Sequence, residues 1–95
     1  MKTKVIFRMF HGEVLALFPQ VATTVGKPWH CHSYAHNGQH GPADCLAVVR
    51  DSRPATHEEW RDLYAELRRI GYRLEVVKRF HAADTQCRRK QLEAA

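Results

Sequence analysis

Residues 29–45 hold most of the side chains in this sequence that could do chemistry. The stretch reads WHCHSYAHNGQHGPADC and contains four of the seven histidines and two of the three cysteines. Imidazole and thiolate are common ligands of zinc in proteins, and imidazole also titrates near neutral pH. The stretch therefore supports three hypotheses: a metal site, a nucleic-acid-binding surface, and a polar strand followed by a turn.

The zinc hypothesis rests on the His-x-His spacing of His30 and His32. Side chains two residues apart on a strand share a face and lie about 7 Å apart. Both rings could therefore converge on one ion, with His36 or His40 as the third ligand. Three histidines and a water form a catalytic zinc site, in which the bound water becomes hydroxide near neutral pH. No CxxC or HExxH motif accompanies them, so we expect no cofactor and keep zinc as the alternative.

A nucleic-acid surface would use the same stretch differently. On an exposed sheet face, bases stack on aromatic rings while cations hold the phosphates. The sequence lacks the aromatic-glycine motifs of established RNA-binding modules, and a solvated basic face would explain the same residues. The residues that would bind under this hypothesis are Tyr34, His36, Gln39, His40, Arg8, Arg73 and Arg79.

The glycines of segment 36–44 allow two interpretations of this segment. Gly38 and Gly41 bracket Gln39 and His40, and glycine lets the backbone adopt positive φ or approach a ligand closely. The segment is therefore either a small polar recognition loop or a tight turn. We favour a non-catalytic binding or assembly module that uses this loop and an exposed face of the sheet.

Catalysis by cysteine has little support in the sequence. A nucleophilic thiol needs a base within hydrogen-bond reach and a donor for the oxyanion. Neighbouring strand residues point to opposite faces, so His30 and His32 cannot readily serve Cys31. We interpret the cysteines as buried, reduced thiols and rank a hydrolase below metal binding, so the sequence leaves enzymatic activity uncertain and favours its absence.

Periodicity assigns the elements that must position these residues. Thr56 and Glu59 form a capping box, an apolar stripe follows at helical spacing, and Gly71 stands just past its end, so 56–71 is predicted to be a helix. Runs rich in β-branched, aromatic and alternating apolar residues predict strands. The predicted strands are 4–10, 13–19, 29–35, 45–51 and 72–80.

These elements predict an α+β fold of order β-β-β-β-α-β. We expect a mainly antiparallel sheet of about five strands in the order 5-1-2-3-4, with the amphipathic helix packed on one face. Trp29 and Cys31 would face that helix, while His30, His32 and Tyr34 would lie on an uncovered face. Apolar side chains on both sides of the first hairpin would make the uncovered face a homodimer interface or a binding surface.

Length and composition limit the classes of protein to consider. The 95 residues allow one domain, predicted over 1–81. A basic tail over 82–95 has few apolar anchors and is expected to be frayed or disordered. No apolar run approaches the roughly 20 residues of a membrane helix, so we expect a cytoplasmic protein without a membrane partner. The net charge of +5 favours acidic partners such as nucleic acid.

Two segments, SYAHNGQHGPAD (33–44) and RPATHEEWRDLYAELRRIGYRLEVVKR (53–79), carry a resemblance together with the KVIFR and ALFP strands. The matching positions of the first segment are Ser33, Tyr34, His36, Gly38, Gln39, His40, Gly41 and Asp44. Over most of 3–79 the chain resembles a family of small bacterial proteins of unknown function. His30 and His32 lie outside the pattern, which shifts interest from them to the 33–44 segment. The resemblance supports the fold and implies no activity, cofactor or partner.

Overall fold

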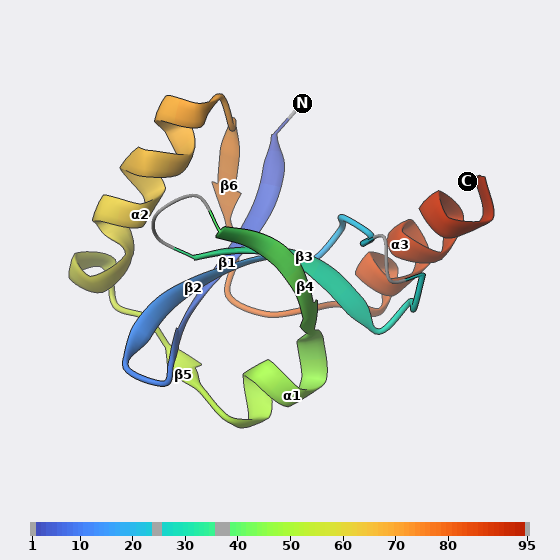
Figure 1. The fold of residues 1–95 in the computed structure, drawn as a ribbon, viewed down its shortest axis with the longest axis horizontal. Helices are drawn as coiled ribbons and strands as arrows, with labels where there is room; N and C mark the ends of the chain where they lie inside the picture. The colour runs from blue at the N-terminus through green and yellow to red at the C-terminus, as the bar shows by residue number, and fades with distance from the viewer. Residues whose placement is uncertain (1, 24–25, 36–38, 95) are drawn as a thin grey trace.

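The computed structural model describes residues 2–23, 26–35 and 39–94. Within them the chain forms strands and helices in the order shown in Figure 1. The elements are β1 (Thr3–Phe10), β2 (Glu13–Phe18), β3 (His30–Ala35), β4 (Gln39–Asp44), α1 (Cys45–Arg50), β5 (Arg53–Pro54), α2 (His57–Ile70), β6 (Leu74–Val76) and α3 (Ala82–Ala94).

The strands form one sheet in the order β4-β3-β2-β1-β5, and β6 also pairs with β1. β1 to β4 form an antiparallel meander, so the predicted α+β class with a mainly antiparallel sheet is confirmed. The last strand was correctly predicted beside the first, but β6 runs parallel to β1. The reason is that α2 carries the chain back along β1 before the chain enters the sheet again (Figure 1).

The fourth strand lies earlier in the chain than predicted. Residues 45–50 form α1, and the preceding segment, interpreted as a turn, is the edge strand β4. Asp44 caps α1 by accepting a hydrogen bond from the Ala47 amide, and the helix turns Cys45 and Val48 toward the sheet. Pro42 is tolerated in β4 because an edge strand has one side without a partner.

The predicted helix and its cap are confirmed. The Thr56 side chain accepts from the Glu59 amide, and the Glu59 carboxylate accepts from the Thr56 amide at 2.8 Å. The Arg53 guanidinium also binds this carboxylate and, with the Thr56 amide, holds the pKa of Glu59 at about 2. Gly71 ends α2 with a φ of 118°, which glycine adopts without the strain of a side chain.

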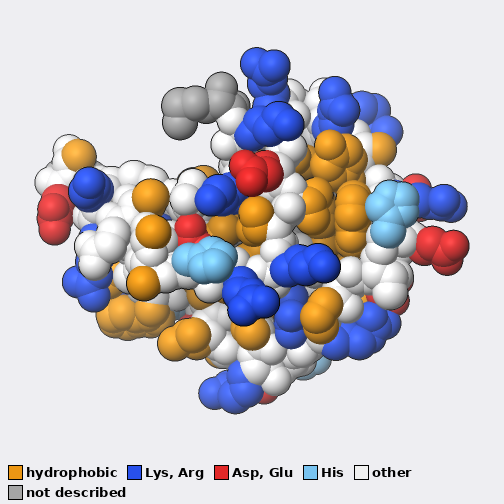
Figure 2. All heavy atoms as spheres, turned by 180° about the vertical axis from the view of Figure 1, so that it is seen from behind, with side chains coloured by type: hydrophobic (Ala, Val, Ile, Leu, Met, Phe, Trp, Pro, Cys, Tyr) orange, Lys and Arg blue, Asp and Glu red, His pale blue; other side chains and the backbone are white. Residues whose placement is uncertain are grey.

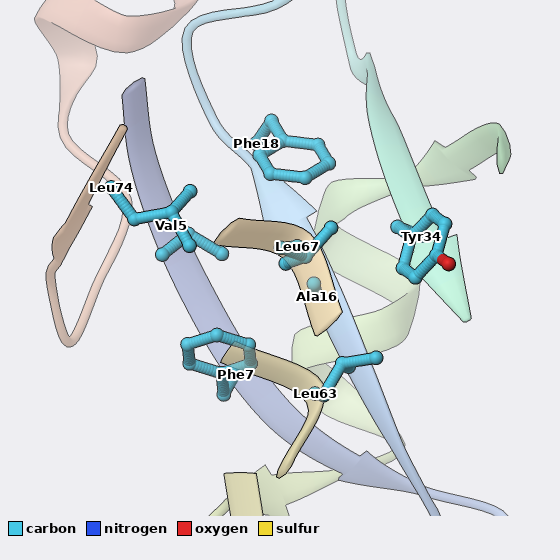
Figure 3. Packing of buried hydrophobic residues seen from close by; sticks show 8 residues of the cluster. All are labelled: Val5, Phe7, Ala16, Phe18, Tyr34, Leu63, Leu67 and Leu74. Atoms are coloured by element: carbon cyan, nitrogen blue, oxygen red, sulfur yellow. The ribbon is translucent and has the colours of Figure 1, made fainter. Parts of the chain in front are cut away.

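One hydrophobic core lies between α2 and the sheet. Figure 3 shows Leu63 and Leu67 of α2 beside side chains of β1, β2, β3 and β6. Phe7 of β1 and Phe18 of β2 belong to this core, as does Tyr34 of β3. Tyr34 therefore faces the helix, which is the reverse of the predicted orientation of β3.

A second core fills the other face of the sheet, which the sequence analysis expected to be uncovered. Ile6, Leu17 and Cys31 point into it from β1, β2 and β3. Cys45 and Val48 of α1 pack against them, with Val77 and Phe80 from the segment after β6. β6 is therefore much shorter than the predicted strand 72–80, because the chain leaves the sheet to help cover this face.

The C-terminal tail, expected to be frayed or disordered, forms α3 and packs beside the segment between β2 and β3 (Figure 1). Asp84 accepts hydrogen bonds from the His81 amide and the Gln20 side chain. The Gln91 side chain accepts from the Ala22 amide. Polar side chains rather than an apolar stripe therefore attach α3, which is why the scarcity of apolar anchors in the sequence did not indicate a docked helix.

Candidate functional site

The structure gathers rings from the histidine-rich stretch around Tyr72, which follows α2. The ring centroids of His32 and His40 lie 5.0 Å apart, and those of Tyr34 and His40 lie 4.6 Å apart. His40 Nε2 lies 3.0 Å from the Tyr72 hydroxyl oxygen. We call His32, Tyr34, His40 and Tyr72 the imidazole–phenol cluster. Gln39, also predicted to bind, is the first residue of β4 and precedes His40.

Tyr34 is a core residue of this cluster. Its side chain is 2% exposed and packs with Leu63 and Leu67 beneath α2. Its hydroxyl donates a hydrogen bond to the Glu66 carboxylate. Base stacking needs an exposed ring face, so the structure does not offer this tyrosine to a nucleic acid.

Burial sets the protonation of two members of the cluster. It lowers the pKa of His32 below the ordinary value of 6.5, and the charge of His40 lowers it further. Burial also raises the pKa of the Tyr72 phenol above 10.0. At neutral pH both groups are therefore uncharged, and the cluster serves to hold the end of α2 against β3 and β4.

The lowered pKa of His32 predicts how stability depends on pH. Below pH 6.5 the unfolded chain protonates His32 more readily than the folded chain does. The unfolded state then binds more protons, so the free energy of unfolding falls as the pH is lowered through this range. Urea unfolding at a series of pH values on either side of 6.5 measures the effect. We expect a His32→Gln variant to show a smaller fall than the parent protein.

A matched His81→Gln variant serves as the control for this prediction. His81 is exposed, so its replacement is expected to leave the pH dependence unchanged. An equal loss of pH dependence in both variants would show that His32 has no special part in it.

The residues proposed as zinc ligands are only partly brought together. His30 lies at the start of β3 beside Trp29, and its buried Nδ1 has no hydrogen-bond partner among the described residues. His36 lies outside the described residues. Over 2–23, 26–35 and 39–94 no three His, Cys, Asp or Glu side chains lie close enough to hold a metal ion. Among the described residues, His32 and His40 are the two predicted zinc ligands whose rings lie close together.

The three predicted arginines occupy different environments. Arg8 is nearly buried and donates to the Ser52 hydroxyl at 2.8 Å and to the Val49 carbonyl at 3.1 Å, which ties β1 to the end of α1. Arg73 and Arg79 are exposed and flank β6. Of the three arginines, Arg73 and Arg79 are therefore the two whose side chains a ligand could contact from solvent.

A groove of about 530 Å³ opens over the middle of β1, between the short strands β5 and β6. Phe7 lies in the groove, with His57 and Trp60 from the start of α2 and with Val76 and Lys78 from the chain around the end of β6. We call it the aromatic groove. Figure 2 shows hydrophobic side chains exposed on this side of the molecule, with Lys and Arg side chains around them.

The rings of the aromatic groove are held in a fixed arrangement. Phe7 and Trp60 stack with centroids 5.0 Å apart and an interplanar angle of 5°. His57 meets Trp60 edge to face, with centroids 4.7 Å apart. Because Phe7 belongs to the core, the sheet supports the stack from below, and the exposed His57 ring lies at its outer end.

Charge is divided between the two flanks of α2. Residues at positions 57, 61, 64 and 68 share the flank that bears His57 and the aromatic groove, so this flank is basic. The opposite flank faces β2 and lines a second groove of about 410 Å³. The charged residues that line this second groove are Glu13 of β2 and, from α2, Glu59, Asp62, Glu66 and Arg69.

His57, Trp60 and Lys78 were not among the candidate residues predicted from the sequence. The apolar stripe already placed Trp60 on the buried side of the helix, and the spacing of His57, Arg61 and Arg68 indicated a basic flank beside it. No local pattern could indicate the groove, because it forms only where β5 and β6 pair with β1 from opposite ends.

In the part of the chain that the structure describes, none of the helices has the length and apolar character needed to cross a membrane. The resemblance to a family of small bacterial proteins stays a prediction. No family model, no curated protein and no solved structure matches this chain.

Proposed function

We propose that this protein is a small non-catalytic module that binds single-stranded nucleic acid in the aromatic groove. The observation that carries the proposal is the exposed His57 ring next to the stacked Phe7 and Trp60, with Lys78 lining the same groove. A nucleobase has an apolar face that can stack on the exposed His57 ring, while the Lys78 ammonium holds a neighbouring phosphate.

The size of the groove favours a single strand over a duplex. Its volume falls within the range of about 300–1,000 Å³ that is typical of small-ligand pockets, so it accepts one or two splayed bases. Specific duplex binding buries about 1,000–2,500 Å² of protein and usually places a helix or β-ribbon in a groove of the DNA. The groove side of this protein is a hollow, which suits an unstacked base.

Electrostatics support an approach of the strand from the same side. Arg61, Arg73, Lys78 and Arg79 are exposed on α2 and around β6. The acidic flank of α2 faces the other way, toward β2. A polyanion is therefore steered toward the aromatic groove by the net charge of +5 and by its distribution.

Fluorescence anisotropy with a labelled homopyrimidine strand of about 10–16 nucleotides tests the proposal. We expect binding that weakens as salt is added, because each phosphate contact releases a condensed counterion. Replacing Lys78 and Arg79 together by glutamate is expected to weaken binding about tenfold or more. Replacing His57 by alanine removes one stacking contact, and we expect a loss of about fivefold or more.

A control pair with the same change in net charge is available on α3. Arg89 and Lys90 are exposed there and can both be replaced by glutamate. We expect this pair to retain most of the affinity. Equal losses in both double variants would show that attraction is diffuse and that the groove is not the site. Absence of binding by the parent protein at low salt would refute the proposed function.

Metal binding by His32 and His40 is the second candidate, and the 5.0 Å between their ring centroids favours it. Two imidazoles give a weaker site than the usual four ligands of zinc. NMR spectra of the histidine rings with and without one equivalent of zinc test it. Changes confined to the NMR signals of these two rings would support the metal site, and unchanged signals would exclude it. Sedimentation of the same samples tests homodimer formation.

A further inference from the structure

Two of the three cysteines lie against each other in the core between α1 and the sheet. Cys31 belongs to β3, and Cys45 is the first residue of α1. β4 pairs with β3 so that Ala43 stands opposite Cys31, and the chain then turns Cys45 back over it. The side chains of the two cysteines pack in the same buried cluster, and the Cys45 thiol donates a weak hydrogen bond to the Ala43 carbonyl oxygen. Both are free thiols.

A buried positive charge lies beside this pair. Arg88 of α3 is 3% exposed, and its guanidinium donates to the Pro28 carbonyl at 2.8 Å, to the Pro19 carbonyl and to the Thr85 hydroxyl at 3.1 Å. These partners are neutral oxygens, so none of them balances the charge of the guanidinium. A thiolate is the anion that the neighbouring Cys45 can provide.

The two thiols differ in acidity. The nearby Cys31 side chain lowers the pKa of Cys45, and the charge of Arg88 lowers it further, against burial and the Asp44 carboxylate. The nearby Cys45 side chain, together with burial, raises the pKa of Cys31. Cys45 is therefore the more acidic thiol of the pair.

Cys45, which is 3% exposed, lines a hollow of about 230 Å³. Trp29 and Leu46, which are 48% and 75% exposed, form part of its lining with Phe80 and Arg88. Such a space holds several water-sized molecules, each of which occupies about 30 Å³ in the liquid. It is suited to a small peroxide and too small for another protein's disulfide loop.

We propose that Cys45 and Cys31 form a dithiol centre that hydrogen peroxide or a small organic peroxide oxidises to a disulfide in a single, non-catalytic event. The Cys45 thiolate attacks one peroxide oxygen, the O–O bond breaks, and hydroxide or alkoxide leaves. The leaving oxygen takes up the proton that Cys45 had released. The Cys31 thiol then attacks the sulfenic acid sulfur, an S–S bond forms and water leaves. Two thiols lose two electrons, and the peroxide gains them.

Oxidation of a Cys87→Ser variant with hydrogen peroxide tests the proposal, because this variant keeps only the two cysteines of the centre. Thiol loss is followed by quenched alkylation and intact mass. We expect a product 2 Da lighter, with the peptides of Cys31 and Cys45 joined by a disulfide. We also expect the rate to rise in proportion to peroxide concentration. A rate independent of peroxide would show that the thiols react only after the protein opens, and would overturn the proposal.

Two further variants separate the roles of the cysteines. In a Cys31→Ser variant the sulfenic acid of Cys45 has no resolving thiol, so dimedone is expected to trap it. A variant with serine at both 31 and 45 keeps Cys87 as a partly exposed reference thiol. We expect Cys45 to react about tenfold or more faster than Cys87. Equal rates for the two thiols, or a dithiol that stays reduced, would overturn the proposal.

Discussion

Replacing Leu67 by alanine is expected to lower the free energy of unfolding by about 2–5 kcal/mol. Leu67 is 0% exposed and packs in the core between α2 and the sheet. The change removes apolar contacts and leaves a cavity that neighbouring side chains fill only in part. A domain of this kind has about 5–15 kcal/mol of stability, so a large fraction is lost. Urea unfolding followed by circular dichroism measures the change.

Leu46 provides the matched control, because the same substitution there removes the same atoms from an exposed position. Its side chain is 75% exposed on α1. We expect Leu46→Ala to change the free energy of unfolding by less than about 0.5 kcal/mol. Similar effects of the two substitutions would contradict the packing of α2 against the sheet.

Replacing Arg88 by alanine is expected to cost about 2–4 kcal/mol and to release α3 first. The substitution leaves the Pro19 and Pro28 carbonyls without their donor beneath the helix. The desolvation cost of the buried guanidinium disappears at the same time and offsets part of the loss. Hydrogen exchange of the α3 amides measures the local effect, and we expect faster exchange there than in β1 to β4.

Arg89 is the neighbouring control, since its side chain is exposed. Arg89→Ala is expected to leave the exchange rates of α3 unchanged. Rapid exchange of α3 in the parent protein itself would contradict the docking of this helix.

Local signals were sufficient for the first hairpin and for α2. Alternating apolar residues predicted the two strands, and His11 and Gly12 between them adopt φ values of 51° and 79°, as a tight turn requires. For α2 the capping box, the apolar stripe and the terminal glycine all agree within one segment. Each of these signals acts between residues close in sequence, which is why the sequence alone was enough.

The segment 45–50 shows where local reasoning failed. A short continuous apolar run suits a buried strand and a buried helix equally well. Asp44 as a cap, with Cys45 and Val48 three residues apart, was the available signal for a helix. Because the fourth strand is residues 39–44, Gly41 and Pro42 lie in an edge strand and not in the predicted turn.

The candidate site was predictable only in part, for a topological reason. The sequence correctly placed His32 and Tyr34 on the same face of their strand. It could not show which face α2 covers, because that depends on the path of the chain after β5. The attachment of α3 could not be predicted either, since Arg88 and Gln91 bond to residues sixty or more positions earlier.

The parallel pairing of β1 with β6 has a consequence for synthesis on the ribosome. β6 pairs with the first half of β1, so the edge of Thr3 to Val5 stays unpaired until Leu74 to Val76 have been made. Ribosomes add about 5–20 residues per second, so the interval between the end of β1 and β6 lasts on the order of several seconds. During this time the apolar Val5, Ile6 and Phe7 are only partly covered. We therefore expect this apolar segment to stay accessible to solvent until β6 has been made.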